Sequence, residues 1–214
     1  ADWKHKTGTY IHVTKFSEIG ASVNNPTAVR DHILSAYTTW EVPPTHVLLI
    51  GDKEIAPVKY ITYDYTFVYD DYFVELEGND YFPELMIGRF TNQTDYRMQV
   101  MINKFMNYEK IPYVQSTDWF KKGLVCANNA YASQRETKRF TATQMLGFGN
   151  FSSVDSMYNG YPCPGNVNDI INMINEGRSF LNYRGEGWST GWWADCIPFQ
   201  TSDVSSINNG QKLT

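Results

Sequence analysis

The 214-residue sequence predicts an α/β fold built on open, mainly parallel sheets, and two observations carry this prediction. Short apolar runs typical of buried strands alternate with longer segments that have the spacing of amphipathic helices. This alternation occurs in both halves of the chain, which predicts two consecutive α/β subdomains at residues 1–115 and 116–214. Because helices connect parallel strands, we expect helices on both faces of the sheets.

The first half begins with the end of a helix at residues 3–7, which Gly8 stops. Asn25 and Pro26 then mark the start of a helix over 27–40. The strands predicted for this half lie at 10–14, 47–50 and 85–90, and a second helix at 94–108. Pro112 ends that helix, so the link to the second half follows it.

The second half repeats this plan. Its predicted strands are 123–127, 154–158 and 179–183, and its predicted helices are 136–146 and 167–176. Gly177 stops the second of these helices.

Composition excludes several classes of partner. The net charge of −5, without a long run of Lys or Arg, argues against nucleic acid and against an anionic membrane surface. No window approaches the roughly 18 apolar residues of a membrane-spanning helix. Aromatic residues make up 15% of the chain, with many Tyr and Asn, a composition that favours a secreted protein.

The three cysteines lack the C-x-x-C spacing of a zinc or redox site. Cys126 lies in the apolar run Gly-Leu-Val-Cys-Ala, which indicates a buried core residue. Cys163 and Cys196 lie in loop-like sequence, and the sequence leaves open whether they form a disulfide.

Glu186 is the polar residue that the sequence places most clearly at a functional position. It follows the predicted strand 179–183 in a turn flanked by Gly185 and Gly187. Open α/β sheets place their chemistry at the carboxyl ends of their strands. The alternative interpretation is that Glu186 only caps the turn.

Seven stretches of the chain, in this order, resemble gingipain-type cysteine peptidases. They are His46-Val-Leu-Leu-Ile-Gly-Asp52, Tyr69-Asp-Asp-Tyr72, Glu77-Gly-Asn-Asp80, Met86-Ile-Gly-Arg-Phe90, Asn107-Tyr-Glu109, Trp119 and Arg184-Gly-Glu-Gly187. The resemblance covers nearly the whole chain and implies a caspase-like fold. It begins inside the first helix of the family and stops before the strand expected to carry the nucleophilic cysteine, so we expect a domain truncated at both ends.

The resemblance also implies where the catalytic groups of such a peptidase would lie. The family turn Asn-Tyr-x-Gly-His-Gly carries the catalytic histidine, and Glu186 occupies that position here. A carboxylate beside a thiol raises the pKa of the thiol, so Glu186 would not support a thiolate. We therefore expect no peptidase activity from this chain, although a changed role for Glu186 in catalysis stays open.

The resemblance implies a substrate pocket near the first turn of the helix predicted over 136–146. Asn129 stands in the loop where the family has the acid that orients the histidine. Arg135 would repel a basic substrate side chain unless Glu136 faces the pocket instead. Trp188 and Trp192 are next to the turn, and they either line a groove for a peptide or glycan or pack in the core.

A cluster of acids offers hard oxygen ligands of the kind that calcium prefers. Its members are Asp70, Asp71, Glu77 and Asp80, with Gly78 allowing a tight turn between them. The resemblance implies a structural calcium ion in this neighbourhood, and no cofactor for catalysis. The alternative is a solvated acidic edge.

The leading hypothesis is a gingipain-like cysteine endopeptidase domain that is inactive as this chain. The alternatives are a non-catalytic module that binds a peptide or glycan, and a scaffold fragment that completes a larger secreted protein. The resemblance implies a bacterial protein, secreted or at the cell surface. Its implied partners are a peptide or protein and the rest of its own precursor.

Overall fold

The computed structural model describes residues 1–128, 131–158, 165–192, 197–209 and 212. The chain divides into two compact units, Ala1–Met101 and Ile102–Thr214. The division falls within helix α3 (Asp95–Lys110), while the sequence predicts the boundary after this helix, at residue 115.

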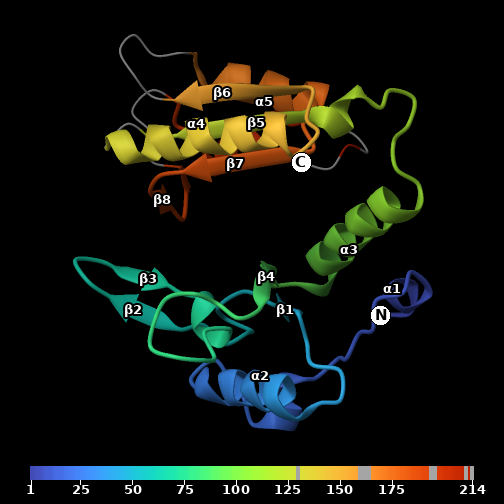
Figure 1. Ribbon diagram of the computed structural model, residues 1–214, viewed down its shortest axis with the longest axis vertical. Coiled ribbons are helices and arrows are strands. Elements are labelled where there is room, and N and C mark those ends of the chain that lie inside the picture. The colour runs from blue at the N-terminus through green and yellow to red at the C-terminus, as the bar shows by residue number, and fades with distance from the viewer. Residues whose placement is uncertain (129–130, 159–164, 193–196, 210–211, 213–214) are drawn as a thin grey trace. The chain divides into compact units, whose positions relative to one another are not determined.

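The first unit is built around two parallel strands, β1 (His46–Ile50) and β4 (Met86–Phe90), which pair from His46 opposite Met86 to Ile50 opposite Phe90 (Figure 1). A small antiparallel hairpin lies between them in sequence. The other elements of this unit, besides the start of α3, are α1 (Asp2–Lys6), η1 (Phe16–Ile19), α2 (Thr27–Thr39), β2 (Tyr60–Thr62), β3 (Thr66–Val68) and η2 (Asp71–Phe73).

The core of the first unit lies between α2 and one face of the β1–β4 pair. Val29 and Ile33 of α2 pack in one cluster with Leu49, Phe73 and Leu85. Side chains alternate between the two faces of a strand, so the neighbours of Leu49 point the other way. Leu48 and Ile50 are accordingly about half exposed, at 51% and 49%.

The strand predicted at 10–14 is wrong, because the structure has no strand or helix there. A strand forms through hydrogen bonds to a neighbouring strand, and none of the described strands pairs with this segment. Tyr10 and Val13 are each 70% exposed. Alternation of apolar and polar residues is therefore not sufficient for a strand here.

The second unit contains a three-stranded parallel sheet in which β5 (Lys122–Ala127) lies between β6 (Ser153–Tyr158) and β7 (Phe180–Arg184) (Figure 1). These strands agree closely with those predicted from the sequence. The remaining elements are η3 (Asp118–Lys121), α4 (Ala132–Gly147), α5 (Val167–Glu176), β8 (Gly187–Trp188), β9 (Gly191–Trp192) and η4 (Thr201–Ser206).

Helices α4 and α5 cover opposite faces of this sheet, as Figure 1 shows. Ile170 and Ile174 of α5 pack against Leu124 and Cys126 of β5. Residues Val125 and Ala127 alternate with these and face α4, and all four β5 side chains are fully buried. Burial on both faces is what the continuous apolar run in this part of the sequence predicts.

The two ends of α5 are defined by local interactions. The Asn166 side chain accepts a hydrogen bond from the backbone of Asn168 at 2.8 Å, and Asp169 accepts one from the backbone of Asn166 at 2.7 Å. Gly177 ends the helix with φ of +100°, which favours glycine. A Cβ there would also lie 2.8 Å from Cβ of Trp119.

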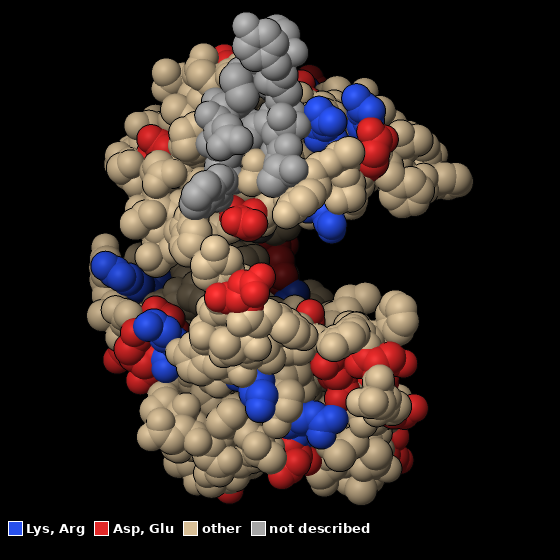
Figure 2. Space-filling view, turned by 90° about the vertical axis from the view of Figure 1, so that its left-hand side faces the viewer, with Lys and Arg blue, Asp and Glu red and all other residues tan. Residues whose placement is uncertain are grey.

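The charged side chains are of mixed sign on the face drawn in Figure 2, and most of that face is uncharged. No helix in the described part of the chain is long and apolar enough to cross a membrane.

Candidate functional site

The turn that carries Glu186 leaves the carboxyl end of β7, at the same sheet edge where β5 ends. Glu186 lies between β7 and the short hairpin of β8 and β9, and its side chain is exposed. The Tyr183 hydroxyl donates a hydrogen bond to the backbone carbonyl of Glu186 at 2.9 Å. The turn is thus held through its backbone, which leaves the carboxylate at the surface.

Gly185 allows the turn to pass close to β5. A Cβ at this position would lie 2.7 Å from Cβ of Asn128 and would also collide with the Tyr183 hydroxyl. The backbone N–H of Asn128 donates to the carbonyl of Arg184 at 3.0 Å, and Asn128 is almost completely buried. The first residue beyond β5 is therefore fixed against the end of β7.

Tyr183 and Trp192 form a stacked pair beneath this turn. Their ring centroids are 4.4 Å apart and the rings are nearly parallel, at 3°. Burial, and then the nearby Glu186 carboxylate, raise the pKa of Tyr183 to about 12. Trp192 therefore belongs to the packing of this edge, whereas Trp188 is 53% exposed and can contact a ligand.

The first turns of α4 contribute charged residues to the same edge. Glu136 pairs with Arg139 at 2.7 Å, and both side chains are more than 60% exposed. Glu136 is thus engaged with a residue of its own helix and does not neutralise Arg135. Asn129, which is also predicted for the pocket, lies outside the described residues.

Sequence reasoning missed Lys138, a buried lysine on α4. Its side chain is only 5% exposed, and its ammonium group donates a hydrogen bond to the side-chain oxygen of Asn182 in β7. The signal in the sequence is the spacing of Gln134, Lys138 and Met145, which places them on one face of the helix. In the structure all three are buried. A lysine on the buried face of a helix is rare without a functional or paired role.

The described part of the chain contains one cysteine, Cys126, and it is buried. Burial raises the pKa of its thiol to about 12, so the thiol stays protonated at neutral pH. The sequence-based interpretation of Cys126 as a core residue agrees with this environment. Cys163 and Cys196 lie outside the described residues, so their pairing stays a prediction. All four histidines of the sequence fall in the first unit.

Three of the four acids predicted to bind calcium have separate partners. Asp70 forms a bidentate pair with Arg89, both contacts being 2.7 Å, and Asp80 accepts a hydrogen bond from the backbone of Phe82 at 2.9 Å. Glu77 contacts Tyr37 and raises the pKa of that phenol. No group of three potential metal ligands converges among the described residues, which include all four acids. As placed, these side chains do not fit a calcium ion, and structural calcium stays a prediction.

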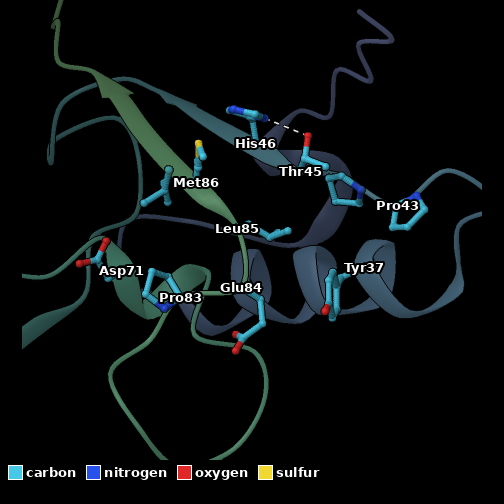
Figure 3. A pocket seen from close by; sticks show the side chains of 11 residues that line it. Tyr37, Pro43, Thr45, His46, Asp71, Pro83, Glu84, Leu85 and Met86 are labelled. Carbon is cyan, nitrogen blue, oxygen red and sulfur yellow. Dashed lines mark hydrogen bonds between the residues drawn. The ribbon is translucent and has the colours of Figure 1, made fainter. Parts of the chain in front are cut away.

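A pocket of about 670 Å³ lies at the opposite, amino-terminal ends of β1 and β4. Figure 3 shows its lining, in which His46 and Thr45 are joined by a 2.9 Å hydrogen bond. The Glu84 carboxylate accepts hydrogen bonds from the backbone of Leu76 and Glu77, which lower its pKa. The Glu84 carboxylate thus holds the loop at Leu76 and Glu77 in place. The pocket lies at the amino-terminal ends of its strands, whereas α/β sheets place their chemistry at the carboxyl ends.

Comparison with known proteins identifies similar sequences. Gingipain R2 and gingipain R1 of Porphyromonas gingivalis are each 26% identical over 219 residues. These matches cover 99% of this chain but only 28% and 21% of the relatives, so the chain spans less than a third of their length. Lys-gingipain of the same organism is 24% identical over 98% of the chain.

Solved structures of gingipains share the fold. The complex of the Porphyromonas gingivalis RgpB pro- and mature domains matches with a TM-score of 0.78 and 24% identity, over 99% of this chain and 49% of that one. The crystal structure of the Arg-specific cysteine proteinase gingipain R matches with a TM-score of 0.77 and 25% identity, over 99% and 48%. The model of peptidase family C25 matches residues 1–214. The α/β chain with Glu186 at its candidate site therefore belongs to peptidase family C25.

Proposed function

We propose that this chain is a peptide-binding part of a gingipain-like peptidase domain and does not cleave peptide bonds by itself. The observation that carries the proposal is the edge formed by β5 and β7. It presents an exposed carboxylate, Glu186, while the described cysteine on β5 is buried and protonated.

The chemistry of a cysteine peptidase explains why this edge would not catalyse. Such an enzyme needs a thiolate to attack the carbonyl carbon and a nearby imidazolium to protonate the leaving amine. Glu186 cannot form a cation, so it cannot stabilise a thiolate by charge. All four histidines of the sequence belong to the first unit, so none follows a strand of the second unit.

Peptide binding is supported by the family and by the surface at this edge. The family hydrolyses peptide bonds, and Trp188 offers an exposed aromatic face next to the turn. A scaffold that loses its catalytic groups can keep its binding groove, because the two depend on different residues.

Two measurements on the 214-residue chain test the proposal. Titration calorimetry with peptides should detect saturable binding, while fluorogenic peptides and a thiol-directed peptidyl reagent should detect neither turnover nor labelling of Cys126. Trp188→Ala should weaken binding, and Trp3→Ala, in α1 of the other unit, serves as the matched control. Turnover that thiol blocking abolishes would contradict the inactive assignment, and absence of any binding would contradict the peptide-binding role.

A second candidate is a scaffold that works together with the rest of its precursor. This candidate is favoured by the solved relative, which is a complex of pro- and mature domains. We place the protein outside a bacterial cell or at its surface, on the strength of the same family and of the aromatic-rich composition. Fractionation of the producing cells tests this location.

A further inference from the structure

Three cationic side chains gather at the carboxyl ends of β5 and β7. Arg184 is the last residue of β7 and lies opposite Ala127, the last residue of β5. Two residues earlier on the same face of β7, Asn182 accepts the hydrogen bond from Lys138. Arg135 lies one turn before Lys138 on α4, and residues three apart are neighbours on a helix surface.

These cations lack an anionic partner among the residues that the structure describes. The acids in the ion pairs of that part of the chain are Asp70, Glu54, Glu136, Asp155 and Glu176, and their cations are Lys53, Arg89, Arg139 and Arg178. The Nε atom of Arg135 is buried and donates to no acceptor in the described residues. A buried donor without an acceptor costs free energy, and an incoming acceptor would recover it.

Lys138 is a second cation at this edge whose positive charge has no anionic partner among the described residues. Its environment offers an amide oxygen, which accepts a hydrogen bond but carries no negative charge. Burial, and then the repulsion of Arg184, lower the pKa of Lys138. An anion at this edge would act in the opposite direction and favour the charged ammonium.

We propose that Arg135, Lys138 and Arg184 form a site for the carboxylate of an Asp or Glu side chain of a bound peptide. The proposal deepens the peptide-binding function above and rests on it for the identity of the ligand. Guanidinium groups bind carboxylates through paired N–H donors, which suits Arg135 with its free Nε. Arg135 also lies in the first turn of α4, where the helix dipole favours negative charge.

The site thus selects for a negatively charged peptide side chain, whereas a solved relative is named for a positively charged one. That relative is described as an Arg-specific proteinase, and an arginine side chain is cationic. At the edge of β5 and β7 in this chain, an arginine side chain would meet Lys138 and Arg184 and be repelled. Acidic peptides should therefore bind in preference to basic ones.

The site is tested by NMR with two small ligands of equal shape, N-acetyl-aspartate N-methylamide and N-acetyl-asparagine N-methylamide. The aspartate compound should shift the Arg135 Nε–H resonance saturably, at least about tenfold more tightly than the asparagine compound. Arg135→Gln should abolish the preference. Arg139→Gln, four residues along the same helix and paired with Glu136, should keep it.

Equal binding of the two compounds, or equal loss in Arg139→Gln and Arg135→Gln, would overturn the proposal. Circular dichroism of each variant establishes that it is folded, and Arg184→Gln at the exposed strand end provides a second variant that should lose the preference. If the aspartate compound binds through Arg135 while longer peptides do not bind at all, the carboxylate site stands and the peptide-binding function fails. If peptides bind without regard to acidic residues, the function stands and this site fails.

Discussion

Arg89 in the first unit and Lys138 in the second are both buried cations next to a parallel sheet, yet their surroundings differ. Arg89 on β4 forms two contacts of 2.7 Å with Asp70 and donates to the carbonyls of Gly51 and Pro57 at 3.1 and 2.9 Å. Lys138 donates to the uncharged side chain of Asn182. The charge of Arg89 is matched within the fold, and the charge of Lys138 is not.

This difference separates a structural cation from a binding cation. A buried ion pair with all its donors satisfied joins the segments that supply its partners, here β4, the residue before η2 and the loop after β1. A buried cation beside a second cation destabilises the fold unless an anion arrives. Lys138, whose charge is not matched, therefore indicates a binding site more strongly than Arg89 does.

The largest effect is expected from breaking the matched pair. Asp70→Ala leaves the Arg89 side chain, which is 8% exposed, without its counter-ion, and should lower the free energy of unfolding by about 3 kcal/mol. Urea denaturation measures the change. Glu54→Ala removes an acid from a pair whose side chains are 50% or more exposed, and should cost less than about 0.5 kcal/mol. Similar losses in both variants would mean that Arg89 does not depend on Asp70.

A smaller effect is expected when the unmatched cation is removed. Lys138→Met keeps the length of the side chain but removes a buried charge, at the expense of one hydrogen bond to Asn182, so stability should change by no more than about 1 kcal/mol. Arg89→Met, made in parallel, should lose about 3 kcal/mol. A larger loss in Lys138→Met than in Arg89→Met would reverse the comparison.

His32 extends the comparison to a base that titrates near neutral pH. Its pKa is lowered by burial and then by His12, and both rings contact the indole of Trp40. A lowered pKa in the folded state means that the unfolded chain binds the proton more tightly, so stability is lost as the pH falls from about 6.5 through the folded pKa. Urea denaturation at pH 7 and pH 5 should show a smaller loss for His32→Gln than for the wild type. An equal loss in His32→Gln and in the wild type would contradict this role of His32.

The smallest effects are expected for the buried thiol of Cys126 in the folded protein and for the exposed carboxylate of Glu186. Cys126 should resist iodoacetamide at pH 8 in the folded protein, because its pKa is about 12, and should react after unfolding in urea. Mass spectrometry measures the fraction alkylated. Fast labelling of the folded protein would show that the thiol is accessible and charged.

Glu186→Gln should change the free energy of unfolding by less than about 0.5 kcal/mol, since its side chain is exposed and the turn is held by the backbone. Gly185→Ala provides the contrast, because the added methyl group meets Asn128 and Tyr183. If Glu186→Gln destabilised the protein as much as Gly185→Ala, the carboxylate would have a structural role that its exposure does not suggest.

The sequence predicted the parallel sheet of the second unit well because β5 is buried on both faces, and burial of this kind leaves a continuous apolar run. It also identified α5, whose Asn166 cap and Gly177 end are local signals. The strand expected at 10–14 failed because pairing depends on a distant partner rather than on the segment itself. The charge balance around Lys138 could not be predicted either, since it depends on where Asn182 and Arg184 lie in the folded sheet.

The position of β5 has a consequence for the order in which the second unit opens. This strand is hydrogen-bonded on both edges and packed on both faces, so its amide hydrogens can exchange with solvent only when the sheet itself comes apart. β6 and β7, each joined to β5 along one edge in the described sheet, can release their outer amides in smaller fluctuations. The backbone beneath the candidate site thus opens last.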